Sequence, residues 1–148
     1  MTRRAIYRSS QAPLNAIWEG SGNVICLDVL RALRVEPEAV HAFLQELSLS
    51  RGKEARYDAM LGDLTSELHA GAADPSSLES RARLLVDKMA VMLQASCLLQ
   101  HGQPDVARAY CASRLPAEGQ LPGANYGARS VDLAAAQDVL IDRVMVFN

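Results

Sequence analysis

The stretch Ile17-Trp18-Glu19-Gly20-Ser21-Gly22-Asn23 places an acidic side chain beside the only tryptophan of this 148-residue chain, directly before a strongly apolar run. The glycines and the serine allow a flat ligand or another backbone to approach closely, because they have little or no side chain. Burial and the helix dipole can both shift the pKa of a carboxylate that lies between an indole ring and the start of a helix. Alternatively, Ser21 or Asn23 caps the helix and the glycines make the turn before it.

This stretch and the run Val24-Ile25-Cys26-Leu27-Asp28-Val29-Leu30-Arg31-Ala32-Leu33 resemble the C-terminal helical domain of the acyl-CoA dehydrogenase superfamily. The similarity is closest to the adaptive-response (AidB-like) flavoproteins. Tyr7-Arg8 and Pro13-Leu14-Asn15 match the same pattern, although the interval between them is longer than in the family. The specific part of the resemblance therefore covers about residues 7–33, and beyond it only a helical pattern continues.

The resemblance implies a catalytic role for Glu19, as the base that takes an α-proton from an acyl thioester while a hydride passes to the flavin. A carboxylate works best as such a base in a dry site, part of whose wall Trp18 would supply. The positions of Trp18, Gly20, Ser21 and Asn23 are those that lie near flavin adenine dinucleotide (FAD) in the family. The family completes this pocket with an N-terminal helical domain and a β-domain, so we expect the 148 residues alone neither to retain FAD nor to oxidise thioesters.

Composition predicts one folded helical domain. Hydrophobic residues make up 49% of the chain, charged residues 22%, and aromatic residues only 5%, which favours helices over a sheet. A net charge of −2 gives no general attraction to nucleic acid or acidic membranes. The start shows no secretory signal and no run is long enough for a membrane span. We expect Cys26, Cys97 and Cys111 to be reduced core residues of a cytoplasmic protein.

Residues 1–21 read as an irregular N-terminal segment, and residues 22–148 as a helical bundle domain. A helix is predicted from Gly22 to about Val35, with its polar residues Asp28, Arg31 and Arg34 in one stripe. Because apolar residues cover almost all of the remaining surface, this helix should be buried on most sides. It should either occupy the centre of the bundle or form an interface with another subunit.

The remaining helices are marked by apolar periodicity and by proline and glycine stops. They are expected from Pro37 to about Leu47, from Lys53 to His69, from Pro75 to His101, from Pro104 to Leu115, and from Val131 to Met145. The longest should bury a seam that begins at Leu78 and a second apolar face from Leu84 onward. A loop is expected over 116–130. Without strand patterns, this order predicts an all-α, antiparallel helical bundle.

Other chemistries have weaker support. Cys97 and His101 share a helix face, but no second pair at ligand spacing accompanies them, so we reject a metal site. No nucleophile motif or phosphate-binding loop is present. The resemblance implies DNA as a partner, yet the two small basic clusters Arg51/Lys53/Arg56 and Arg81/Arg83/Lys88 lack the density of a phosphate track, which favours solvated helix faces.

Two functional hypotheses are consistent with these patterns. In the first, the chain is the C-terminal helical portion of an AidB-like acyl-CoA dehydrogenase homologue, either a fragment or a separately encoded remnant. In the second, it is a non-catalytic helical module that forms homo-oligomers or binds a partner through the apolar helix 22–35. A DNA-binding accessory domain is a third, weaker hypothesis.

Overall fold

The computed structural model describes residues 22–74, 78–115 and 137–144. Six helices are defined there: α2 (Asn23–Val35), α3 (Pro37–Ser48), α4 (Ala55–Ala73), α6 (Ala82–His101), α7 (Pro104–Arg114) and α8 (Gln137–Val144). The described residues contain no strand, so the predicted all-α class is confirmed. Within the described residues, no helix is both long and apolar enough to span a membrane.

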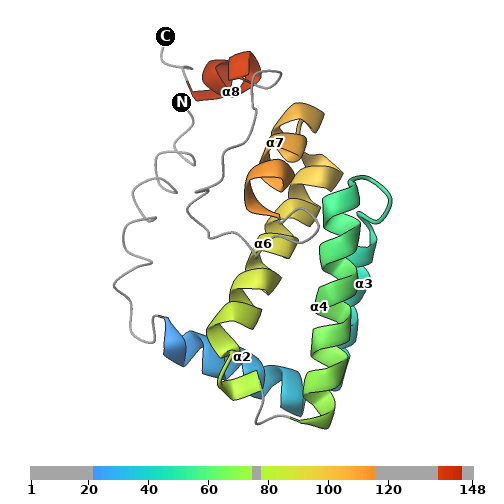
Figure 1. Cartoon of the computed structure of the whole chain (residues 1–148), viewed down its shortest axis with the longest axis vertical. Helices are drawn as coiled ribbons and strands as arrows, with labels where there is room; N and C mark the ends of the chain where they lie inside the picture. Colours follow the sequence, from blue (N-terminus) through green and yellow to red (C-terminus); the bar gives the residue numbers. More distant parts are fainter. Residues whose placement is uncertain (1–21, 75–77, 116–136, 145–148) are drawn as a thin grey trace.

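The helices α3, α4 and α6 lie side by side along the length of the molecule, with α2 across one end (Figure 1). Colours along the chain show that α4 runs opposite to both α3 and α6, which confirms the predicted antiparallel bundle (Figure 1). The central helix is α6, because it packs against α2, α3, α4 and α7. Of the two positions offered for the helix of residues 22–35, the centre of the bundle is therefore wrong among the described residues, and an interface with another subunit stays a prediction.

Local chemistry explains where α3 and α4 begin and end. Pro37 occupies the first turn of α3, where its missing N–H costs nothing. Gly52 adopts φ 81°, which suits a residue without a side chain, and its N–H donates to the Asp58 carboxylate at 3.0 Å. Glu54 then caps α4 by accepting a hydrogen bond from the Tyr57 N–H at 2.9 Å. The α3–α4 turn is thus closed by two local interactions, from the Gly52 N–H to Asp58 and from the Tyr57 N–H to Glu54.

The core lies between α3, α4, α6 and α7. The predicted buried face of α4 is confirmed, since its apolar residues are all buried: Tyr57, Met60, Leu61, Leu64 and Leu68. The predicted seam of the helix 75–101 is confirmed as buried for Leu78, which precedes α6, and for Ala82, Leu85, Met89, Met92 and Ser96 of α6, with Leu99 partly buried. Tyr57 satisfies its buried hydroxyl by donating to the Leu47 carbonyl at 2.8 Å, and burial raises the pKa of this phenol.

A buried polar pair joins the α3–α4 turn to α6. The hydroxyl oxygens of Ser50 and Ser96 are 3.0 Å apart, and both residues are fully buried. Gln100 donates to the Ser96 hydroxyl at 3.0 Å and to the Glu46 carboxylate at 3.1 Å. Because each buried hydroxyl has a partner, this network holds the two elements in register without an unpaired polar group.

Two expectations about the longest helix are corrected. A turn at residues 80–81 interrupts it, so α6 begins at Ala82 and not at Pro75. Arg81 has φ −116° and ψ 12°, and this change of direction lets Leu78 pack against Gly71. The second apolar face is mostly not enclosed: Val91 is buried, but Leu84 and Leu93 are exposed, because no described helix covers that side.

The end of the chain is described only in part. Helix α8 covers residues 137–144 of the predicted helix 131–145, and the predicted loop 116–130 lies outside the described residues. The helix predicted from Pro104 is confirmed as α7. On its predicted inner face, Ala107 and Cys111 are buried, and Val106 and Tyr110 are partly buried. Leu115, directly after α7, is buried on the same side.

Gly71 provides the first stability prediction. A Cβ atom at Gly71 would lie 2.2 Å from Leu78 Cδ1, so the buried Leu78 side chain would have to move. We expect Gly71→Ala to lower the free energy of unfolding by about 1–3 kcal/mol, because overpacking outweighs the gain in helix propensity. Gly62 in the same helix has open space at its Cβ position. Gly62→Ala should therefore stabilise the protein by about 0.5–1 kcal/mol. Urea unfolding of both variants tests this, and equal effects would contradict the Leu78 contact.

Candidate functional site

The predicted site residues Trp18, Glu19, Gly20 and Ser21 lie outside the described residues, so their roles stay predictions. Asn23 is described, as the first residue of α2. Gly22 precedes it at the N-cap position with φ 68°, a conformation that glycine adopts without strain. The predicted apolar helix therefore begins directly after Gly22, with Asn23 as its first residue.

Asn23 does not cap α2. The cap position belongs to Gly22 and no side chain makes a cap hydrogen bond, so the alternative role that the sequence offered for Asn23 is wrong. Instead its side-chain oxygen accepts a hydrogen bond from Arg83 at 3.3 Å, which connects the start of α2 to α6. Asn23 is exposed, and no atom lies within 4 Å of a Cβ built on Gly22. Among the described residues, none therefore crowds the start of α2.

The apolar side chains of α2 are only partly buried. Cys26 is its one buried residue, while Val24, Ile25 and Leu27 are about half exposed, at 56%, 50% and 50%. The predicted polar stripe of Asp28, Arg31 and Arg34 is exposed, as expected. Burial on most sides is thus not achieved by the described residues, because α2 crosses one end of the bundle and touches it along one face only.

The opposite end of α2 borders a cavity of about 700 Å³. Side chains from α2, α3 and the end of α4, together with Leu78 and Glu79, form its walls. Most of the lining is apolar. Its charged or titratable residues are Arg31, Arg34, His41, His69 and Glu79. Sequence reasoning missed this cavity. The sequence pointed to it only through Arg31 and Arg34, which were interpreted as part of the polar stripe of the helix. The sequence does not show that α3 and α4 meet beside these two residues.

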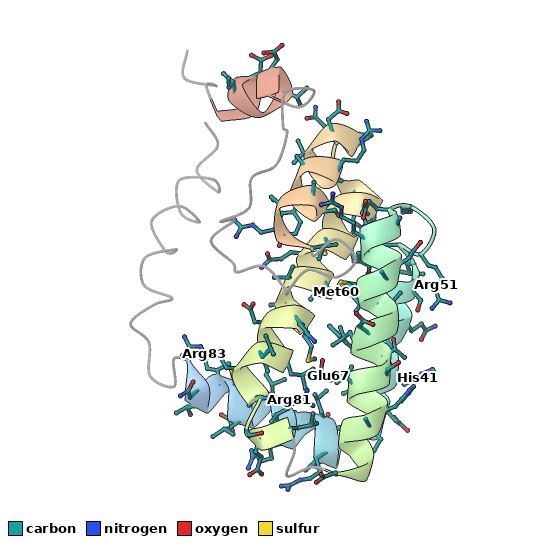
Figure 2. All side chains as sticks on the ribbon, in the orientation of Figure 1. His41, Arg51, Met60, Glu67, Arg81 and Arg83 are labelled. Carbon is teal, nitrogen blue, oxygen red and sulfur yellow. The ribbon has the colours of Figure 1, made fainter. Side chains whose placement is uncertain are left out.

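The two basic clusters are mostly engaged in contacts within the fold. Glu67, whose side chain is 10% exposed, pairs with Lys88 at 2.6 Å and with Arg81 at 3.3 Å; Figure 2 shows Glu67 and Arg81 between α4 and α6. In the other cluster, the Lys53 ammonium donates a hydrogen bond to the backbone carbonyl of Leu99, and the Arg56 guanidinium donates one to the backbone carbonyl of Ala112. These side chains therefore connect helices. The predicted solvated faces are present for the exposed Arg51, Lys53, Arg81 and Arg83, whereas Arg56 and Lys88 are partly buried.

The cysteines differ in their surroundings. Cys26 and Cys111 are buried as predicted, but Cys97 is exposed, which corrects the expectation that all three are core residues. Cys97 and His101 lie on a surface of α6 that no described helix covers. Among the described residues, no three His, Cys, Asp or Glu side chains gather in a group able to hold a metal ion.

Thiol reactivity should follow this difference. Burial raises the pKa of the Cys111 thiol to about 12, so that at pH 8 only about one Cys111 in ten thousand is a thiolate. We expect a thiol-specific reagent to modify Cys97 quickly and Cys111 only after unfolding. Reaction of native protein followed by peptide mass analysis measures the order, and Cys97→Ser should remove the fast phase. Rapid labelling of native Cys111 would contradict its burial in the core.

Comparison with known proteins supports one relationship. Over 115 residues the chain is 30% identical to a protein of Escherichia coli (strain K12) described as putative acyl-CoA dehydrogenase AidB. The matching region covers 77% of this chain but only 20% of the AidB chain. No protein-family model matches the sequence, and no solved structure gives a significant match.

The all-helical bundle fits the C-terminal helical domain that the resemblance predicted. Together, the helix that begins at Asn23 and the identity with AidB confirm that resemblance. The chain therefore resembles the C-terminal helical domain of the acyl-CoA dehydrogenase superfamily, being similar to AidB and spanning about one fifth of the length of AidB.

Proposed function

We propose that this chain is the C-terminal helical portion of an AidB-like flavoprotein, and that residues 18–23 form part of its flavin and thioester site. The identity with AidB is the observation that carries this proposal. The start of α2 is compatible with it, because Gly22 and Asn23 are exposed and no described residue crowds Gly22. The free cysteines are compatible with a cytoplasmic location.

In this proposal Glu19 is the base that removes the α-proton of an acyl thioester. FAD, when bound, supplies the acceptor for the hydride. Trp18 would exclude water from the carboxylate, while Gly20 and Ser21 would let the ring approach the backbone. Asn23 would hold the flavin edge from the first turn of α2, where it is already fixed by its hydrogen bond from Arg83.

The chain should not perform this reaction by itself. Proton abstraction by a carboxylate needs a site that excludes water. Here Asn23 is exposed and the neighbouring Val24 and Ile25 are half exposed, so the described helices do not enclose this end of α2. We infer that other polypeptide covers these apolar side chains in the active assembly.

A chimera tests the proposal. In E. coli AidB, the segment that matches this chain would be replaced together with its N-terminal flank by residues 7–148 of this chain, so that Glu19 is included. The purified product would be examined for bound flavin and for oxidation of acyl thioesters with a dye as electron acceptor. We expect a yellow protein. Glu19→Gln in the chimera should keep the flavin and lose the oxidation, whereas the chain alone should do neither. A folded chimera without flavin would contradict the proposal.

Self-association is a second candidate function, favoured by the half-exposed Val24, Ile25 and Leu27 of α2. A second copy could cover this face in the absence of any flavin domain. Sedimentation of the chain should then show a dimer or larger oligomer that Ile25→Glu dissociates. Leu49→Glu is the matched control, because Leu49 is 57% exposed but follows α3. A monomer at all concentrations would exclude this function.

DNA binding is not part of the proposal. Five of the six basic residues in the two clusters make hydrogen bonds or ion pairs within the fold, namely Lys53, Arg56, Arg81, Arg83 and Lys88. A phosphate contact would have to compete with these interactions. Retention of the purified chain on immobilised duplex DNA at low salt, lost at high salt, would reverse this conclusion.

A further inference from the structure

The cavity beside the C-terminal half of α2 is a separate feature from the motif at its N-terminus. Arg31 lies eight residues after Asn23, which is roughly 12 Å along the helix axis. Neither Asn23 nor Gly22 lines the cavity. Its volume of about 700 Å³ lies within the range of about 300–1,000 Å³ typical of small-molecule sites. A ligand in this cavity would therefore be independent of the proposed flavin site.

The inner wall of the cavity is apolar. Leu30 and Leu33 of α2, Val40 and Leu44 of α3, and Leu68 of α4 lie along it, and Leu78 closes one side. Leu68 and Leu78 are buried, while the other four are partly buried and belong to the rim of the main core. An alkyl tail that displaces water from these side chains would be favoured by the hydrophobic effect.

The charged groups at the cavity are mostly basic. Arg31, Arg34, His41 and His69 are cationic or able to become so, and Glu79 is the one carboxylate in the lining. Arg31 and Arg34 are three residues apart on α2, so their like charges lie on one helix face. Among the residues that the structure describes, neither guanidinium has a hydrogen bond or an ion pair. An anion between them would relieve this repulsion.

The shape and the charge together select a ligand class. A tail alone would leave the arginines unpaired, and a small anion alone would leave the apolar wall wet. A guanidinium group binds a planar carboxylate through two parallel hydrogen bonds. We propose that this cavity binds a single-chain alkyl carboxylate, with its tail against Leu30, Leu44 and Leu68 and its headgroup at Arg31 and Arg34.

The experiment is a calorimetric titration of the full chain with decanoate, below its micelle-forming concentration, at a pH where the acid is ionised. We expect saturable binding of one molecule per chain. Decanol is the matched probe without a charge, and it should bind at least about tenfold more weakly. The double variant Arg31→Gln/Arg34→Gln should lose about tenfold in affinity for decanoate and little for decanol.

The control variant removes the same net charge elsewhere. Arg51 and Arg108 are exposed and do not line the cavity, and Figure 2 shows Arg51 well away from His41 along α3. Arg51→Gln/Arg108→Gln should therefore bind decanoate as the unmodified chain does. Val40→Trp, which narrows the cavity at its apolar wall, should weaken the binding of both probes; circular dichroism verifies that it is folded.

Three results would overturn the proposal. They are the absence of saturable decanoate binding, equal affinity for decanol and decanoate, and an equal loss in the control and the cavity double variants. Because all four substituted arginines are exposed, these outcomes do not depend on a variant that fails to fold. None of them bears on the flavin proposal, which the chimera tests separately.

Discussion

Leu85→Ala should lower the free energy of unfolding by about 3–4 kcal/mol. Leu85 is fully buried on α6, the helix that packs against α2, α3, α4 and α7. Truncation removes its transfer free energy and leaves a cavity between elements that cannot all close around it. Urea unfolding followed by circular dichroism measures the loss.

The adjacent Leu84 is the matched control for this prediction. It carries the same side chain in the same helix but is 45% exposed. Leu84→Ala should change the free energy of unfolding by less than about 1 kcal/mol, because little packing is lost and alanine has the higher helix propensity. Similar losses at both positions would mean that α6 turns a different face towards the core.

Glu67→Ala should destabilise the protein by about 3 kcal/mol. The Glu67 carboxylate is nearly buried between α4 and α6, where Lys88 Nζ lies 2.6 Å away and is itself only 14% exposed. Removing the carboxylate leaves the Lys88 ammonium with poor solvation and without its partner. Arg81 is 52% exposed, so its pairing with Glu67 contributes less.

Two further variants separate the lost pair from a general effect. Glu67→Ala combined with Lys88→Met should recover much of the stability, because no unpaired charge then remains. Asp105→Ala breaks the exposed pair with Arg108 on α7, where the side chains are 44% and 69% exposed, and should cost at most about 1 kcal/mol. Equal losses for Glu67→Ala and Asp105→Ala would contradict a special role for burial. Thermal and urea unfolding measure all three.

The link between Glu67 and Lys88 also shows what the sequence could not reveal about the basic residues. Lys88 and Arg81 lie on exposed-looking positions of a helical pattern, and nothing local indicates that α4 brings a carboxylate to them. Glu67 is 21 residues before Lys88 in the chain. Residues that look free for phosphate contacts in the sequence are thus partly consumed by helix pairing.

The candidate site divides in the same way. The sequence predicted a helix that begins at the glycine-rich turn, and α2 begins at Asn23. It also named the acyl-CoA dehydrogenase superfamily from residues 7–33, which the similarity to AidB confirms. It could not reveal the cavity at Arg31 and Arg34, because that cavity exists only where α2, α3 and α4 converge.

What the sequence by itself determined is the set of helices and most of their buried faces. Pro37, Gly52, Gly102 and Pro104 set boundaries through backbone constraints that act within a few residues, and the periodicity of α4 identified its core side. Such signals are local, so they survive without knowledge of the fold.

Only the tertiary structure decided which apolar faces are covered. It placed α6 at the centre and left Val24 and Ile25 of α2 half exposed, although α2 has the more continuous apolar pattern. It also paired Ser50 with Ser96, 46 residues apart. The physical reason is that the hydrophobicity of a side chain determines how much free energy its burial contributes. The packing of helices that are distant in sequence determines whether that side chain is buried.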